Sequence, residues 1–332
     1  MLSAIPYIGT DLVYFVWGGF SVQLAPFGDD IDLQILLFAG KSSIGIEYET
    51  LIVQNIVKKS RTRGQSAGVR ILSTYVHALQ RLNAGDLFFP YFVGLIEGCG
   101  YFSIYKNGLY IQFEFGMEFS LKDLPFFYKI KDQLQIGIIR YNRNTVSFKV
   151  INKSSLINVI FPIFDKYPFL SNKQYDYLRF KEILLSDIKL YDQIPTYIKP
   201  SQFFNSINFI LEVPYFSPWL IGFIEAEGCF SIYQPNNDYS FVASFDIGQK
   251  NELNLLLAIQ KFFSFFVNIT DLGDHNYKLK VSSVRYISNL IQFLDKTSVK
   301  FLGYKKLQYI LWLKKLRQIP RYSQKINIPQ NY

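Results

Sequence analysis

Hydrophobic and polar positions follow the same pattern twice along the chain. An apolar run begins after Pro90 and ends at Gly100, and a second begins after Pro218 and ends at Gly228. Proline in the first turn and glycine after the last turn are typical of the two ends of a helix. The residues that follow each glycine alternate between apolar and polar side chains, which predicts a strand. The copies read PYFVGLIEGCGYFSIY and PWLIGFIEAEGCFSIY, so the sequence predicts an internal duplication.

The periodicity predicts the same order of elements after each copy. Further strands are expected at 109–116, 145–151, 240–248 and 277–282, and helices at 124–134, 156–164, 174–188, 252–263, 284–294 and 302–317. Each half is therefore expected to run helix–strand–strand–helix–strand–strand–helix. The predicted fold class is α+β, with two pseudo-symmetric halves in one chain.

Composition along the chain divides it into five expected segments. The two repeated domains are predicted at 86–188 and 218–332, joined by a linker at 189–217 that contains Pro195, Pro200 and Pro214. Before them come residues 1–23 and a basic segment, 24–85. The basic segment, with Lys58 and Lys59 among its cations, is expected to be a solvated and poorly ordered linker. The alternative is a basic arm that contacts phosphate.

The N-terminal residues 3–22, SAIPYIGTDLVYFVWGGFSV, resemble a short internal piece of mitochondrial cytochrome b. This resemblance indicates a reading frame that begins in a cytochrome b exon and continues into an intron, in a mitochondrial genome. A chance apolar N-terminus is the alternative. The uncharged run at 12–28 is short for a spanning helix and contains Pro26, so no stable membrane span is expected.

Charge points to a polyanionic partner. The chain has 35 Lys and Arg against 26 Asp and Glu, a net charge of +9, which suits nucleic acid or an anionic membrane surface. Residues 296–332 contain nine cations and no acid. Phosphate contacts are expected from Lys306, Lys314, Lys315, Arg317 and Arg321, although a solvated helix face has the same composition. Two Cys and two His exclude a structural zinc site and a disulfide framework.

Small residues recur at a spacing of four in both predicted helices. Gly94 and Gly98 lie on one face of the first helix, and Gly222 and Ala226 lie on one face of the second. Such stripes allow two backbones to approach closely. The two helices are therefore expected to pack on each other across a pseudo-twofold axis within a monomer.

Acidic residues lie at the C-termini of the same two helices. Glu97, Glu225 and Glu227 are at the end where the helix dipole and the free carbonyls are already negative. A bound cation would resolve this conflict, and a few carboxylates with open water positions suit Mg²⁺. Phosphodiester hydrolysis by metal-bound water is the chemistry that such a site favours.

These paired motifs, 92–100 and 220–228, closely resemble the LAGLIDADG family of homing endonucleases and group I intron maturases. The resemblance covers residues 86–332, about three quarters of the chain. The stretches SNKQYDYLRF (171–180) and KKLQYILWLKKLR (305–317) are similar to a branch of the family that combines DNA endonuclease and RNA maturase activity in a fungal cytochrome b intron. The resemblance implies two αββαββα domains, each with a curved antiparallel sheet that binds the major groove of DNA.

The family's metal-binding acid is the eighth residue of the motif, which is Glu227 in the second copy and Cys99 in the first. A protonated thiol is a poor ligand for Mg²⁺, so Cys99 is a degenerate metal position and Glu97 is at most a weak one. The resemblance also implies catalytic roles for Gln249 and Lys305, with Lys173 as the counterpart in the first half. Leu121 takes the position that matches Gln249 in the first half, so the polar residue is absent there.

Two functions follow from the resemblance. The first is an RNA maturase that binds its own group I cytochrome b intron in the mitochondrion and needs no metal acid. The second is an endonuclease that uses Mg²⁺ to cut double-stranded DNA at the intronless exon junction. Cys99 favours the first, and Glu227, Gln249 and Lys305 favour the second.

Overall fold

The computed structural model describes residues 13–17, 20–25, 34–39, 87–235 and 241–332. The chain divides into two compact units, Met1–His77 and Ala78–Tyr332. In the first unit, three strands form an antiparallel sheet in the order β1-β2-β3: β1 (Val13–Trp17), β2 (Phe20–Ala25) and β3 (Gln34–Ala39). Most of the residues to which the cytochrome b resemblance and the basic linker were assigned lie outside the described residues.

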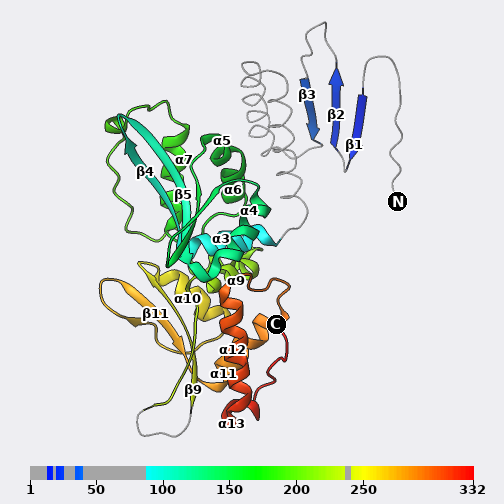
Figure 1. The fold of residues 1–332 in the computed structure, drawn as a ribbon, viewed down its shortest axis with the longest axis vertical. Coiled ribbons are helices and arrows are strands. Elements are labelled where there is room, and N and C mark those ends of the chain that lie inside the picture. Colours follow the sequence, from blue (N-terminus) through cyan, green and yellow to red (C-terminus); the bar gives the residue numbers. More distant parts are fainter. Residues whose placement is uncertain (1–12, 18–19, 26–33, 40–86, 236–240) are drawn as a thin grey trace. The chain divides into compact units, whose positions relative to one another are not determined.

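The second unit contains two halves of the same architecture (Figure 1). The first half comprises α3 (Phe88–Cys99), β4 (Gly100–Asn107), β5 (Tyr110–Ser120), η1 (Leu121–Asp123), α4 (Leu124–Leu134), β6 (Ile138–Tyr141), β7 (Thr145–Val150), α5 (Lys153–Ser155), the π-helical η2 (Leu156–Ile160), α6 (Phe161–Lys166) and α7 (Lys173–Leu185). Its sheet has the strand order β4-β5-β7-β6, and the described neighbours are antiparallel.

The second half repeats this order after the connection that contains η3 (Tyr191–Gln193) and α8 (Ile207–Glu212). Its elements are α9 (Phe216–Glu227), β8 (Cys229–Tyr233), β9 (Val242–Lys250), α10 (Leu253–Phe262), β10 (Thr270–Asp271), β11 (Asn276–Val281), α11 (Val284–Lys296), α12 (Tyr304–Gln318) and α13 (Pro320–Ser323). The antiparallel sheet has the order β10-β11-β9-β8. The predicted α+β class with two αββαββα halves is confirmed.

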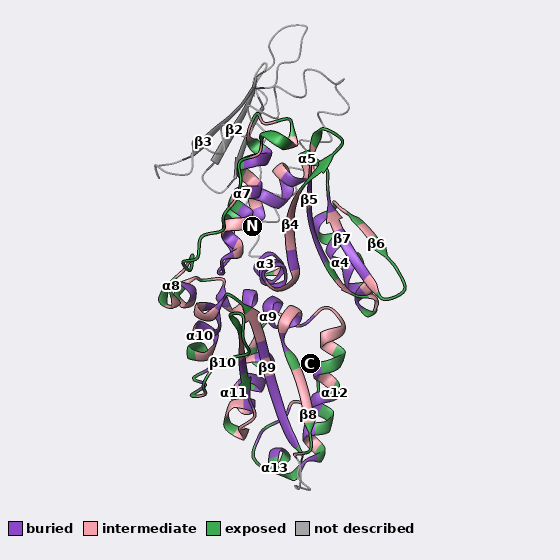
Figure 2. Cartoon of the chain, turned by 90° about the vertical axis from the view of Figure 1, so that its left-hand side faces the viewer, coloured by how far each residue is buried: buried purple, intermediate pink, exposed green. Residues whose placement is uncertain are grey.

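One face of each sheet packs against helices, because apolar residues alternate along the strands. Phe115 and Phe148 in the first sheet, and Phe245 and Leu279 in the second, are fully buried. Figure 2 shows long buried stretches on β7 and β9. The residues that alternate with these buried residues along each strand lie on the opposite face of the sheet, which we call the open face. It carries polar pairs such as Lys278 and Asp246, whose Nζ and Oδ1 atoms are 2.9 Å apart.

Helices α3 and α9 lie side by side at the junction of the two halves (Figures 1 and 2). Each ends at a glycine in extended conformation whose N–H donates back to the helix, from Gly100 to Ile96 O and from Gly228 to Ile224 O. A Cβ at Gly100 would lie 2.4 Å from the Ile96 side chain, so this helix end requires glycine. The chain therefore passes directly from each helix into the first strand of its sheet.

Candidate active site

The small residues of α3 and α9 face one another at the helix crossing. A Cβ on Gly94 would lie 1.8 Å from the carbonyl oxygen of Trp219, and a Cβ on Gly222 would lie 1.9 Å from that of Tyr91. One turn later, a Cβ on Gly98 would lie 2.5 Å from the Cβ of Ala226. The absence of side chains thus brings the two helix backbones into direct contact and sets their C-termini next to each other.

Glu97 is engaged by protein donors on both carboxylate oxygens. Its Oε2 accepts from the Leu170 N–H at 2.8 Å and from Trp219 Nε1 at 3.2 Å, and its Oε1 accepts from the N–H and hydroxyl of Ser171. The side chain is only 3% exposed. Both carboxylate oxygens of Glu97 are therefore engaged by protein donors, which favours a structural role over the weak metal role expected from the sequence.

Glu225, the equivalent acid of the second half, has the equivalent partners. It accepts from the Leu302 N–H at 2.9 Å, from the Gly303 N–H and from the Tyr91 hydroxyl. Burial raises the pKa of Glu225 to about 7, against the effect of these hydrogen bonds. Sequence reasoning could not foresee these donors, because they come from segments that are distant along the chain.

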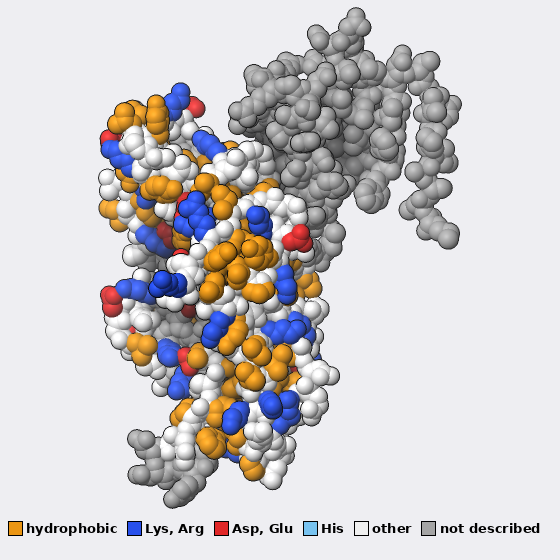
Figure 3. Space-filling view, viewed as in Figure 1, with side chains coloured by type: hydrophobic (Ala, Val, Ile, Leu, Met, Phe, Trp, Pro, Cys, Tyr) orange, Lys and Arg blue, Asp and Glu red, His pale blue; other side chains and the backbone are white. Residues whose placement is uncertain are grey.

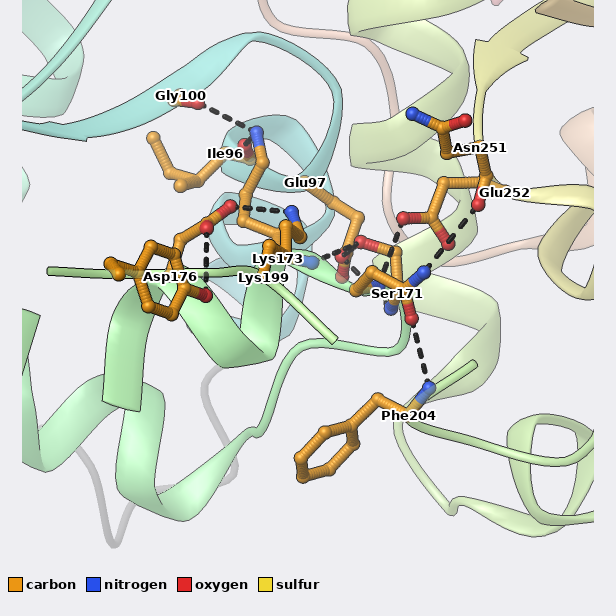
Figure 4. A network of polar contacts seen from close by, with 12 residues as sticks. Ile96, Glu97, Gly100, Ser171, Lys173, Asp176, Lys199, Phe204, Asn251 and Glu252 are labelled. Atoms are coloured by element: carbon orange, nitrogen blue, oxygen red, sulfur yellow. Dashed lines mark hydrogen bonds and ion pairs between the residues drawn. The ribbon is translucent and has the colours of Figure 1, made fainter. Parts of the chain in front are cut away.

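Two lysines supply the cations that the negative helix ends favour. Lys173 Nζ donates to Ile96 O at 2.7 Å and to Gly100 O at 2.6 Å, at the end of α3 (Figure 4). Lys305 Nζ donates to Gly228 O at the end of α9. Burial lowers the pKa of both ammonium groups, while the neighbouring acids act in the opposite direction. An ammonium group of a lysine therefore lies against the free carbonyls at the end of each of these two helices.

Glu227 is the carboxylate that remains available at the junction. It is half-buried, at the end of α9. Burial raises its pKa, and the charges of Lys173 and Lys305 together with a hydrogen bond from Gln249 oppose that shift. The residues expected to be catalytic in the second half, with Lys173 from the first, therefore lie within electrostatic reach of one carboxylate.

Cys99 occupies the equivalent position at the end of α3. Its Sγ donates to Leu95 O at 3.1 Å, and burial raises the pKa of the thiol well above its ordinary value. A protonated thiol cannot bind Mg²⁺ as a carboxylate does. Among the described residues, no group of three or more His, Cys, Asp or Glu side chains could hold a metal ion. Glu227 fits one hard cation with water and phosphate oxygens as further ligands, and Cys99 does not fit it.

The sheet register corrects the position that matches Gln249 in the first half. Tyr101 and Cys229 are equivalent, because each directly follows the glycine that ends its motif helix. In the sheets, Tyr101 pairs with Gly116 and Cys229 pairs with Asp246. Counting forward from these two partners, Gln249 corresponds to Phe119. Leu121, the match expected from a constant offset, begins η1 instead. The position remains apolar, so the first half has no counterpart of the Gln249 amide.

The basic residues expected to bind nucleic acid lie on or after α12, in the helix layer. Lys314, Lys315 and Arg321 are exposed, whereas Arg317 donates to Pro329 O and fixes the C-terminal segment. Lys306 is half-buried. On the face drawn in Figure 3, Lys and Arg side chains lie beside apolar ones over the region of α11 and α12, and acidic side chains are sparse there. These cations are therefore separate from the open faces of the sheets.

Asp123 and Glu252 were missed by the sequence reasoning. Asp123 Oδ1 accepts from the Tyr304 N–H at 2.7 Å, and Glu252 Oε1 accepts from the Asn172 N–H at 2.9 Å. Both acids are buried. A sequence signal exists, since each half has an acid shortly after the end of its second strand.

The profile of the LAGLIDADG endonuclease family matches residues 92–184 and 220–316, more than half of the chain. The chain therefore belongs to the LAGLIDADG endonuclease family. It is similar to the probable intron-encoded endonuclease Cox1-I1b of Schizosaccharomyces pombe, with 30% identity over 260 residues. It is also similar to the probable intron-encoded endonuclease aI3 of Dictyostelium citrinum, with 28% identity over 215 residues, and to the mitochondrial protein RF1 of Saccharomyces cerevisiae, with 26% over 254 residues.

These matches cover 71%, 60% and 72% of this chain, and 66%, 84% and 52% of the respective relatives. The chain thus spans between about half and five sixths of their lengths. Two solved structures share the fold. I-SmaMI, bound to uncleaved DNA with calcium ions, has a TM-score of 0.58 and 21% identity and covers 72% of this chain and 96% of its own. I-GzeII, in complex with its DNA target, has a TM-score of 0.59 and 21% identity, with coverages of 72% and 92%.

Among the described residues, no helix is both long and apolar enough to cross a membrane.

Proposed function

We propose that the chain is an RNA maturase that assists splicing of its own group I intron, derived from a DNA homing endonuclease. The observation that carries this proposal is the contrast between Cys99 and Glu227. The helix pair, both lysines and both sheets are retained, but the eighth motif position of α3 holds a thiol that donates to its own helix. A fold kept intact without one metal acid fits a protein selected for binding more than for cutting both DNA strands.

The basic part of the helix layer supports an RNA partner. Lys314, Lys315 and Arg321 are exposed there, away from the open sheet faces by which the resemblance implies DNA binding. Exposed cations suit the phosphates of a folded RNA, because double-stranded RNA is recognised mostly by its shape and its phosphates. The cytochrome b resemblance of residues 3–22 supports a cytochrome b intron as the RNA and the mitochondrion as the place of action.

The test is splicing of the precursor RNA at low Mg²⁺, with and without the purified full chain. We expect the protein to accelerate splicing, and Glu227→Gln to accelerate it equally, since that carboxylate has no part in RNA binding. Equal splicing rates with and without the protein would refute the maturase function.

A second function, cleavage of DNA at the intronless exon junction, is favoured by the residues around Glu227. This carboxylate would hold Mg²⁺ against a phosphate, and the metal would activate water and stabilise the leaving oxygen. Lys305 and Gln249 would orient the phosphate and the water. With one metal acid, we expect at most nicking of one strand.

Supercoiled plasmid containing the exon junction distinguishes these outcomes. We expect the wild-type chain with Mg²⁺ to yield at most nicked circles, and Cys99→Asp to yield linear product. The gain should be on the order of 10²-fold or more, the effect of restoring one group that stabilises the transition state. The matched control, Cys99→Asp with Glu227→Gln, should remove the linear product. Linear product from the wild-type chain would show that the thiol does not impair cleavage.

A further inference from the structure

Helices α7 and α12 each begin beside a carboxylate that belongs to the other half. Asp123 follows β5 in the first half and accepts from the N–H of Tyr304, the first residue of α12 in the second half. Glu252 precedes α10 in the second half and accepts from the N–H of Asn172, next to the start of α7 in the first half. The arrangement is pseudo-symmetric, so one accidental contact does not explain it.

A second carboxylate holds the two preceding N–H groups in each case. Glu97 accepts from Leu170 and Ser171, and Glu225 accepts from Leu302 and Gly303. Three consecutive amides at the start of α7, and three at the start of α12, are therefore held by two buried acids, one from each half. Free N–H groups at a helix start need hydrogen-bond acceptors, and the oxygens of these buried acids supply them.

Each capped residue directly precedes a lysine of the candidate site. Asn172 precedes Lys173, whose Nζ reaches Ile96 O and Gly100 O, and Figure 4 shows this lysine, Glu97 and Glu252 around one loop. Tyr304 precedes Lys305, whose Nζ reaches Gly228 O. A shift of the capped backbone would therefore move the lysine that follows it.

We propose that Asp123 and Glu252 are positioning residues that act across the junction, so that each half positions the candidate-site lysine of the other. Glu252 positions Lys173, and Asp123 positions Lys305. This inference concerns the same site as the proposed endonuclease function, but it predicts lysine geometry whether or not the chain cuts DNA.

The test measures the reactivity of individual lysines in the full chain by trace acetylation and peptide mass spectrometry. We expect Glu252→Ala to raise the labelling of Lys173 and leave that of Lys305 unchanged, and Asp123→Ala to do the reverse. The change should be about two- to tenfold, corresponding to the loss of one buried hydrogen bond. The control, Glu212→Ala, removes an exposed acid and should change neither lysine.

Rescue by conservative variants separates positioning from charge. Glu252→Gln and Asp123→Asn keep an oxygen that can accept the same N–H and have no titratable group, so they should restore the wild-type labelling. If an alanine variant does not fold, Glu252→Asp and Asp123→Glu displace the acceptor by one methylene and should give the same crossed pattern. Labelling that rises equally at both lysines, or that the amide variants fail to restore, would overturn the proposal.

Discussion

At the scale of single residues, the two cysteines differ in their exposure and in their hydrogen bonding. Cys99 donates to Leu95 O, and burial raises the pKa of its thiol, whereas Cys229 is exposed at the start of β8. Only the thiolate reacts with alkylating agents. We therefore expect iodoacetamide to label Cys229 at least about tenfold faster than Cys99 in the native chain at pH 7.5. This ratio corresponds to an accessible thiolate fraction that is about tenfold smaller at Cys99 than at Cys229.

Mass spectrometry of the two cysteine peptides measures these rates. In urea the two thiols should react at similar rates, which serves as the control for intrinsic differences. Equal rates in the native chain would show that the Cys99 thiol is as reactive as an exposed one and that its hydrogen bond to Leu95 O does not protect it.

The glycines of the helix crossing give a second prediction at this scale. Gly94→Ala would place a Cβ 1.8 Å from a backbone oxygen, a clash that no side-chain rotation relieves. Overpacking in a core typically costs about 1–3 kcal/mol, and here we expect the upper end or more. The measurement is the urea midpoint of unfolding. Gly248→Ala is the matched control, because its Cβ would make an ordinary contact of 3.4 Å, and a similar loss in both variants would contradict the close crossing.

At the scale of elements, the sequence predicted helices α3 and α9 well, because proline, glycine and a repeated motif mark their ends. It identified three strands in each half and missed β6 and β10. These edge strands are short and exposed, so they lack the apolar alternation that reveals a buried strand. The acids at the helix ends were found, but Glu97 was assigned to metal, because its donors, Leu170 and Ser171, are close only in the folded chain.

Helix α12 is the element on which the RNA proposal can be tested by charge. Lys314→Glu with Lys315→Glu reverses two exposed charges, and we expect weaker binding of the intron RNA. The slope of log affinity against log salt should fall by about 2, one for each lost phosphate contact. Filter binding over a range of salt concentrations measures both effects.

A charge-matched control comes from α4. Lys129→Glu with Lys131→Glu makes the same change at exposed positions of the first half. If both pairs of substitutions reduce the slope equally, the effect is one of net charge and α12 is not a specific contact surface.

At the scale of the whole molecule, the two halves share one polar junction. Trp219 of the second half donates to Glu97 of the first, and Tyr91 of the first donates to Glu225 of the second. Together with the crossed caps from Asp123 and Glu252, this arrangement makes each half incomplete without the other. The junction is therefore expected to be the most pH-sensitive part of the fold, because it buries four carboxylates.

Glu252 gives the sharpest test of that sensitivity. Burial raises its pKa to about 8, and the charge of Glu97 adds to the shift, while the Asn172 N–H, Lys199 and Lys173 oppose it. The ordinary value of 4.5 applies to the unfolded chain. Between these two values the folded chain retains a proton that the unfolded chain has lost. This contribution to stability is complete below about pH 4.5 and is lost as the pH rises through about 8.

Stability should therefore fall as the pH rises from 5 to 8, by at most about 1.4 kcal/mol per pH unit from this one proton. Glu252→Gln cannot titrate and keeps an acceptor for Asn172, so its urea midpoint should depend less steeply on pH than that of the wild-type chain. Burial also raises the pKa of Glu225, Glu97 and Asp123, so part of the slope should remain. Glu212→Gln, at an exposed position, should follow the wild-type curve. Parallel curves for Glu252→Gln and the wild-type chain would mean that Glu252 is ionised in the folded state throughout this range and that the junction tolerates its charge.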